Sequence, residues 1–138
     1  MANRFTKGNG LFGSLRTSGA ARVADFSVNR PAAGTVADGA SMALSATDVN
    51  EKTIIAVTPT TARNIQFPTA ALLIAAVTGY EVGDTIEFTL INLAAASDMT
   101  ATVNTGLTFV GSVAVVAASS ATWAIRIASA TTVVCYRQ

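Results

Sequence analysis

Histidine is absent from the 138 residues, and cysteine occurs once, at Cys135. Without histidine the chain lacks the commonest general base, the usual catalytic triads and the most frequent metal ligand. One cysteine forms no disulfide within the chain and builds no zinc or iron–sulfur site by itself. Because valines and a tyrosine flank Cys135, we interpret it as a small apolar side chain of the last strand rather than a reactive thiol.

Charged residues are also scarce: they make up 12% of the chain, against 51% hydrophobic residues. Soluble domains carry about 25% charged residues, so a surface this poor in charge is usually covered by lipid or by protein. The longest apolar runs, 70–77 and 113–118, are far shorter than the roughly 20 residues of a membrane-spanning helix. The hydrophobic stretch of a signal peptide does not follow Arg4 and Lys7. We therefore expect a protein made in the cytoplasm, outside any membrane, whose surfaces are buried in an assembly.

The charges are unevenly distributed, which divides the chain into an N-terminal arm, residues 1–40, and a body, residues 41–138. Residues 1–30 hold five basic residues and one acidic residue, a net charge of +4, whereas the remainder holds four basic and seven acidic residues, a net charge of −3. Arginines of the arm are widely spaced and alternate with apolar residues. This favours docking on a protein partner over direct contact with nucleic acid, which a clustered basic tail would indicate. The candidate partner-binding residues of the arm are Phe5, Leu11, Phe12, Leu15, Arg16, Arg22 and Phe26.

Short β patterns fill the body from about residue 42. The clearest is 85–92, where Ile86, Phe88 and Leu90 alternate with polar residues and are expected to face inward. In 122–128 the same alternation directs Trp123, Ile125 and Ile127 into the core. Further strands are predicted at 52–58, 63–67, 99–104 and 131–137, and a hairpin is predicted from 107–110 and 113–116 across Gly111-Ser112.

The apolar run 70–77 is the one predicted helix, since alanines fill it and Gly79 follows where a C-terminal cap belongs. A buried strand is the alternative interpretation of this run. Short strands at intervals of roughly 10 residues indicate an all-β fold: an antiparallel β-sandwich or jelly-roll-like body with one short helix and an extended N-terminal arm.

No arrangement of acidic residues predicts catalysis. Asp84 and Glu87 lie an odd number of residues apart on a strand, so they point to opposite faces, and Asp84 is expected to serve a turn beside Gly83. Asp48, Asn50 and Glu51 lack the spacing of a calcium loop, and we interpret them as a polar turn before the strand at 52–58. We expect no enzymatic activity, no cofactor, no metal and no small-molecule substrate.

Several segments of the body resemble the small β domains of tailed-bacteriophage virion proteins, particularly capsid decoration or cement proteins and related head-fibre domains. The resemblance covers about half the chain and lies in the strand and turn patterns of residues 66–70, 82–92, 118–126 and 132–137, with the glycine-punctuated hairpin around Gly106 and Gly111. It implies a virion structural protein on the capsid surface that binds the major capsid protein and stabilises the phage head. It also implies contacts with copies of itself, as a homotrimer or interlocked subunits.

The alternative is a head-fibre, collar or adsorption module that binds a host receptor or glycan. Such a module needs exposed aromatic side chains, and Tyr80, Trp123 and Tyr136 are few for that task.

Overall fold

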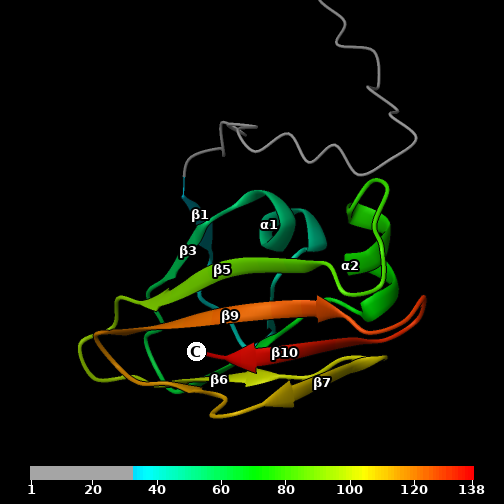
Figure 1. Cartoon of the computed structure of the whole chain (residues 1–138). Helices are drawn as coiled ribbons and strands as arrows, with labels where there is room; N and C mark the ends of the chain where they lie inside the picture. The colour runs from blue at the N-terminus through cyan, green and yellow to red at the C-terminus, as the bar shows by residue number, and fades with distance from the viewer. Residues whose placement is uncertain (1–32) are drawn as a thin grey trace, which may run out of the picture.

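The computed structural model describes residues 33–138, which form ten strands and two helices (Figure 1). Six strands build one sheet in the order β1-β3-β5-β9-β10-β7, and four build a second sheet in the order β2-β4-β6-β8. The elements are β1 Gly34–Val36, β2 Met42–Ala43, α1 Ala46–Glu51, β3 Ile54–Val57, β4 Arg63–Gln66, α2 Ala70–Ala76, β5 Thr85–Asn92, β6 Met99–Thr102, β7 Leu107–Val110, β8 Ala114–Val115, β9 Ser119–Ile127 and β10 Val133–Arg137.

The first six strands wind as a coil that passes back and forth between the sheets. β1, β3 and β5 lie side by side and parallel in the six-stranded sheet, while β2, β4 and β6 do the same in the four-stranded sheet. We call these pairs coil 1 (β1 and β2), coil 2 (β3 and β4) and coil 3 (β5 and β6). Equivalent positions stack from coil to coil, so that Gly34 lies beside Ile55, which in turn lies beside Leu90.

The chain returns to the six-stranded sheet through α1 after coil 1 and through α2 after coil 2. Each helix starts with an N-cap hydroxyl, Ser45 or Thr69, which accepts a hydrogen bond from a backbone N–H of the first turn. Four positions later each helix buries an apolar side chain, Val49 or Leu73. The two helices pack against each other. Each forms the same kind of connection from the four-stranded sheet to the six-stranded sheet.

The C-terminal strands close the structure with antiparallel pairings. β9 pairs along the whole length of β5, from Thr85 opposite Arg126 to Asn92 opposite Ser119. β10 is antiparallel to β9 and parallel to β7, which forms the far edge of the six-stranded sheet. β8 is antiparallel to β6 and forms an edge of the other sheet.

The core lies between the two sheets and under the helices. It includes an aromatic cluster in which the ring centroid of Phe67, just after β4, is 5.3 Å from that of Trp123 and 5.6 Å from that of Phe88. The predicted inward residues of 85–92 and 122–128 are confirmed, because Ile86, Phe88, Leu90, Trp123, Ile125 and Ile127 are all buried. The helix predicted at 70–77 is confirmed as α2.

The predicted all-β antiparallel sandwich or jelly roll is wrong. Both sheets are mixed, most strand pairings are parallel, and the described residues contain two helices. The strand positions were predictable because alternation reveals which side chains are buried. Their pairing was not, because short loops such as residues 37–41 and 58–62 carry the chain across to the other sheet instead of back along the same one.

The hairpin predicted from 107–110 and 113–116 is also wrong. Gly111, with a φ of 99°, turns the chain from β7 in one sheet to β8 in the other. The polar turn predicted around Asp48 is helix α1 instead. A serine followed three positions later by an acidic residue, here Ser45 and Asp48, is a pattern that marks the start of a helix. This pattern could have identified α1 from the sequence.

The predicted arm falls mostly on residues 1–32, which lie outside the described residues. Its final part includes β1, which forms an edge of the six-stranded sheet beside β3.

Asn92, at the end of β5, is the one buried polar residue among residues 33–138. Its side-chain amide donates to the carbonyl oxygens of Ser97 at 2.8 Å and Val115 at 3.0 Å, and its Oδ1 accepts from the backbone N–H of Ala94 at 3.0 Å. These bonds join the end of β5, the loop toward β6 and strand β8. Asn92 therefore holds the turn that leads from β5 to β6.

We expect Asn92→Ala to lower the free energy of unfolding by about 2–4 kcal/mol, because three backbone groups, two of them in buried hydrogen bonds, lose their partner. Urea denaturation of the purified protein measures this. Asn64→Ala on the exposed side of β4 is the control, and it should change stability by less than about 0.5 kcal/mol. Equal stability losses in both variants would contradict the role assigned to Asn92.

Candidate interaction surface

The candidate site is the outer face of the six-stranded sheet, the side that points away from the core. It consists of the outward side chains of alternate strand positions: Thr35, Ile54, Ala56, Thr85, Glu87, Thr89, Ile91, Thr108, Val110, Ser120, Thr122, Ala124, Arg126, Val134 and Tyr136. In Figure 1, strands β5, β9 and β10 of this sheet run across the view. We refer to these residues as the outer face.

The outer face is almost uncharged. Glu87 and Arg126 are its charged side chains, and they lie on the neighbouring strands β5 and β9. Glu87 accepts a hydrogen bond from Gln138 Nε2 at 3.0 Å. Threonine, alanine and serine fill most of the centre, where the hydroxyls of Thr89 and Thr122 lie 3.1 Å apart across the two strands.

Large apolar side chains lie exposed toward both sides of this face. Ile54 on β3 is 40% exposed, Tyr136 on β10 is 38% exposed and Val110 on β7 is 48% exposed. Monomeric proteins usually protect sheet surfaces and edges with charge, especially with lysine. This face lacks that protection, so its chemistry suits contact with another protein surface.

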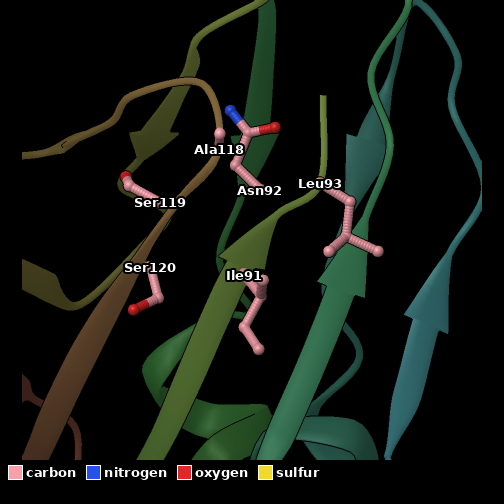
Figure 2. A pocket seen from close by; sticks show the side chains of 6 residues that line it. All are labelled: Ile91, Asn92, Leu93, Ala118, Ser119 and Ser120. Atoms are coloured by element: carbon pink, nitrogen blue, oxygen red, sulfur yellow. The ribbon is translucent and has the colours of Figure 1, made fainter. Parts of the chain in front are cut away.

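A shallow hollow lies at the end of the outer face where β5 stops and β9 begins. Figure 2 shows Ile91 on β5 near Ser120 on β9, with Leu93 and Ala118 in the adjoining loops. The lining contains no charged group, so it offers apolar and hydroxyl contacts rather than a place for acid–base chemistry.

The acidic residues singled out in the sequence serve local structure. Asp84 Oδ2 accepts a hydrogen bond from the backbone N–H of Glu81 at 2.9 Å beside Gly83, whose φ is 108°, so the predicted turn role is confirmed. Asp48 accepts a hydrogen bond from the Ser45 hydroxyl at 2.6 Å at the start of α1. Among residues 33–138, no group of three or more histidine, cysteine or acidic side chains is placed to hold a metal ion.

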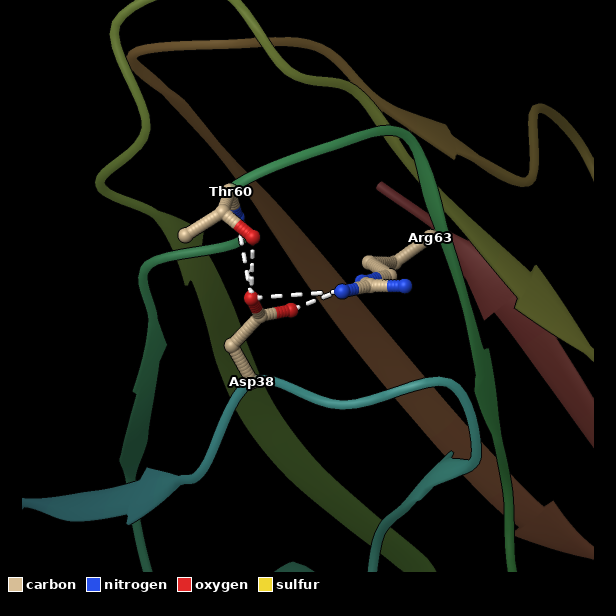
Figure 3. Close-up of polar contacts among 3 residues, drawn as sticks. All are labelled: Asp38, Thr60 and Arg63. Atoms are coloured by element: carbon tan, nitrogen blue, oxygen red, sulfur yellow. Dashed lines mark hydrogen bonds and ion pairs between the residues drawn. The ribbon is translucent and has the colours of Figure 1, made fainter.

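A polar cluster of Asp38, Thr60 and Arg63 joins coil 1 to coil 2 (Figure 3). Asp38, in the loop after β1, accepts from Arg63 Nε at 2.8 Å and from the Thr60 hydroxyl at 2.5 Å. The hydrogen bond from Arg63 holds the pKa of the Asp38 carboxyl well below its ordinary value of 3.8, with a further contribution from Thr60. This cluster could not be predicted from the sequence, because Asp38 lies 22 and 25 residues before its two partners.

Cys135 and Trp123 are both core residues, as predicted. Cys135 is fully buried, and burial raises the pKa of its thiol to about 12. Trp123 is also fully buried, and within the described part of the chain its indole N–H has no hydrogen-bond partner. Arg137 lies over its ring, with the guanidinium carbon 5.8 Å from the ring centroid.

The structure does not test the predicted arm residues. All of them lie outside the described residues, and their partner-binding role stays a prediction: Phe5, Leu11, Phe12, Leu15, Arg16, Arg22 and Phe26. The outer face could not be predicted from the sequence, since assembling outward positions into one face requires the order of the strands.

Comparisons with known proteins identify no relative: no family model, curated protein or solved structure matches the chain. No helix within residues 33–138 is long and apolar enough to cross a membrane.

We expect Cys135 to resist alkylation in the folded protein at pH 8, because the thiolate is the reactive form and the buried thiol stays protonated. Mass spectrometry after treatment with iodoacetamide measures the modified fraction, with urea-unfolded protein as the reactive control. Rapid labelling of the folded protein would place the thiol at an accessible position instead.

Acid should loosen the junction between coils 1 and 2. Because the pKa of Asp38 is lower in the folded protein, its carboxylate contributes stability above its unfolded pKa near 3.8, and this contribution is lost as the pH falls further. The difference in thermal stability between the wild type and Asp38→Asn should therefore shrink from about pH 5 to about pH 2. Glu51→Gln, at an exposed position of α1, is the control. A difference for Asp38→Asn that stays constant across this range would contradict the expectation.

Proposed function

We propose that this chain is a non-enzymatic virion structural protein that binds the shell of the major capsid protein and stabilises a bacteriophage head from its outer surface. The observation that carries the proposal is the outer face of the six-stranded sheet, an ordered surface of small and apolar side chains with one acidic and one basic group. A capsid shell offers the extended protein surface that such a face can cover.

The size of the outer face supports docking on protein together with a second contact. Six strands of 3 to 9 residues, about 4.8 Å apart and rising about 3.3 Å per residue, give a face on the order of 500 Å². Each partner in a specific complex of standard size buries about 800 Å². The predicted partner-binding arm is the natural source of the additional contact.

Three of the segments that resemble decoration proteins also contribute to this surface. Residues 82–92 contain β5, residues 118–126 contain most of β9, and residues 132–137 contain β10. These three strands are neighbours and form the centre of the outer face. Much of the resemblance therefore lies in the sheet that carries the outer face.

The receptor-binding or glycan-binding alternative has weaker support. Glycan sites usually expose aromatic rings, and Trp123 is fully buried in the core. Tyr136 is 38% exposed on the outer face. One exposed tyrosine on a flat face gives a small platform for a sugar, whereas a protein surface can use the entire face.

The test is binding of the purified chain to shells assembled from the major capsid protein of the same virus. Ile54→Lys and Tyr136→Lys should each weaken binding by at least about tenfold, because a lysine buried without a partner costs more than about 1.4 kcal/mol. Co-sedimentation with shells measures binding, and thermal unfolding confirms that each variant remains folded.

Leu72→Lys is the matched control, because Leu72 is 58% exposed but lies on α2. It should bind shells like the wild type. Failure of the wild-type chain to bind shells would overturn the proposed function. Wild-type affinity in both outer-face variants would instead remove the outer face from the contact.

A further inference from the structure

Of the four edge strands of the two sheets, β7 is the longest. β1 has 3 residues, β2 and β8 have 2 each, and β7 has 4. Within residues 33–138, β7 pairs with β10 alone, so its other side is open, and β7 lies at the lower margin of the body in Figure 1. The strand has no lysine, proline or inward charge, the features with which proteins usually protect an edge. We call this open side the β7 edge.

The register between β7 and β10 shows which backbone groups face the β7 edge. The N–H of Val133 donates to the carbonyl oxygen of Gly106, and the two strands are parallel. In a parallel pair, alternate residues turn their N–H and C=O groups toward the partner strand, and the residues between them turn theirs away. The residues of β7 and its end that turn away from β10 are therefore Leu107, Phe109 and Gly111.

The free groups of these three residues are arranged symmetrically about Phe109. The N–H of Leu107 is already used, because it donates to the carbonyl oxygen of Asn104 at 3.1 Å. At the other end Gly111, with a φ of 99°, turns the chain out of the sheet. Among the described residues, no partner takes the C=O of Leu107, the N–H and C=O of Phe109 or the N–H of Gly111.

A second β7 edge satisfies all of these groups at once. When two copies are related by a twofold axis at Phe109, the two Phe109 residues exchange both of their backbone hydrogen bonds. The C=O of Leu107 in each copy then accepts from the N–H of Gly111 in the other. The used N–H of Leu107 lies opposite the point where the chain leaves the sheet, so it needs no acceptor there. This match favours a second copy as the occupant, since an unrelated strand has no reason to begin and end at these positions.

The side chains of β7 fit the same twofold contact. Val110 points outward, is 48% exposed and would lie opposite Thr108 of the second copy. Phe109 points inward, where its ring centroid is 5.0 Å from those of Phe67 and Trp123. Although it belongs to the aromatic cluster of the core, Phe109 is only partly buried. The contact would set the two Phe109 side chains beside each other and cover both.

We propose that the β7 edge binds the β7 edge of a second copy of this chain, antiparallel and with a twofold axis between the two Phe109 residues. The two six-stranded sheets then form one continuous sheet. Because the axis is perpendicular to the sheet, both outer faces lie on the same side. Such a contact uses the same surface on both copies and closes at a dimer, unlike the trimer that the resemblance implies.

The joined sheet also enlarges the surface available to a partner. One outer face, on the order of 500 Å², is smaller than the roughly 800 Å² that each partner buries in a complex of standard size. Two joined outer faces give on the order of 1,000 Å² on one side of the dimer. This supporting argument rests on the proposed function, whereas the contact between copies is argued from the β7 edge itself.

Cysteine cross-linking tests the register. In the proposed contact the Cα atoms of Thr108 and of Val110 in the second copy are about 4.5 Å apart, within the roughly 4.4–6.8 Å that a disulfide spans. Two copies of the same position lie diagonally, about 7–8 Å apart. Thr108→Cys and Val110→Cys chains with different affinity tags, mixed and mildly oxidised, should therefore give at least about tenfold more heterodimer than either homodimer. The native Cys135 is buried and takes no part.

Val110→Cys mixed with Thr35→Cys is the matched control, because Thr35 is an outward threonine on β1, the other edge strand of the same sheet. This pair should give at least about tenfold less heterodimer than Thr108→Cys with Val110→Cys. An equal or greater yield from the control would overturn a second β7 as the occupant. A statistical mixture of homodimers and heterodimers from the test pair, or no cross-link at all, would also overturn it.

Sedimentation equilibrium measures the contact without a cross-link. Val110→Lys should weaken self-association by at least about tenfold, because a lysine on an edge strand opposes pairing. Val82→Lys is the control, since Val82 is 62% exposed in the turn before β5, and it should associate like the wild type. Equal association of all three chains, or a wild type that stays monomeric, would contradict the β7 contact.

Co-sedimentation with capsid shells separates this inference from the proposed function. A wild-type chain that binds shells but gives no β7 cross-link would overturn the β7 contact alone. A cross-linked β7 dimer that binds no shell would overturn the proposed function and leave the contact between copies in place.

Discussion

The backbone ladder on either side of β5 is the interaction on which the rest of the molecule depends. On one edge β5 bonds in parallel to β3, and on the other it bonds antiparallel to all of β9. It therefore joins the wound N-terminal coils to the C-terminal strands within one sheet. The same strand buries Phe88 and Leu90 on the inner side and ends in Asn92, which holds the loops at the corner. Loss of register along β5 would disconnect the two halves and turn its apolar side chains outward.

The sheet that β5 organises has two faces of different purpose. Its inner face is packed against the second sheet, the helices and the aromatic cluster around Trp123, so it needs no partner. Its outer face carries mainly threonine and other small side chains, with the larger apolar side chains of Ile54, Val110 and Tyr136 exposed. The scarcity of charged residues in the chain thus falls on one defined surface, the outer face. This placement, rather than composition alone, supports a structural role in an assembly.

Several features were predictable because they depend on residues close together in the chain. The segment 85–92 shows its burial pattern directly, and β5 has those same bounds. The alanine-rich run became α2, with the Thr69 cap beside it. Helix α1 was equally predictable from Ser45 and Asp48, but Asp48 was interpreted as part of a polar turn. The ion pair of Asp38 with Arg63 was not predictable from the sequence, because no local pattern connects residues of successive coils.

The sequence by itself determined where most strands lie, which of their side chains are buried and how little charge remains for the surface. Only the tertiary structure decided which strands are neighbours, in which direction they run and therefore which outward residues share a face. The reason is physical: burial acts through side chains, whose alternation is written along the chain, whereas strands are joined by backbone N–H and C=O groups that are nearly the same at every position. Alternating side chains therefore specify the inside of a strand but not the partner at its edge.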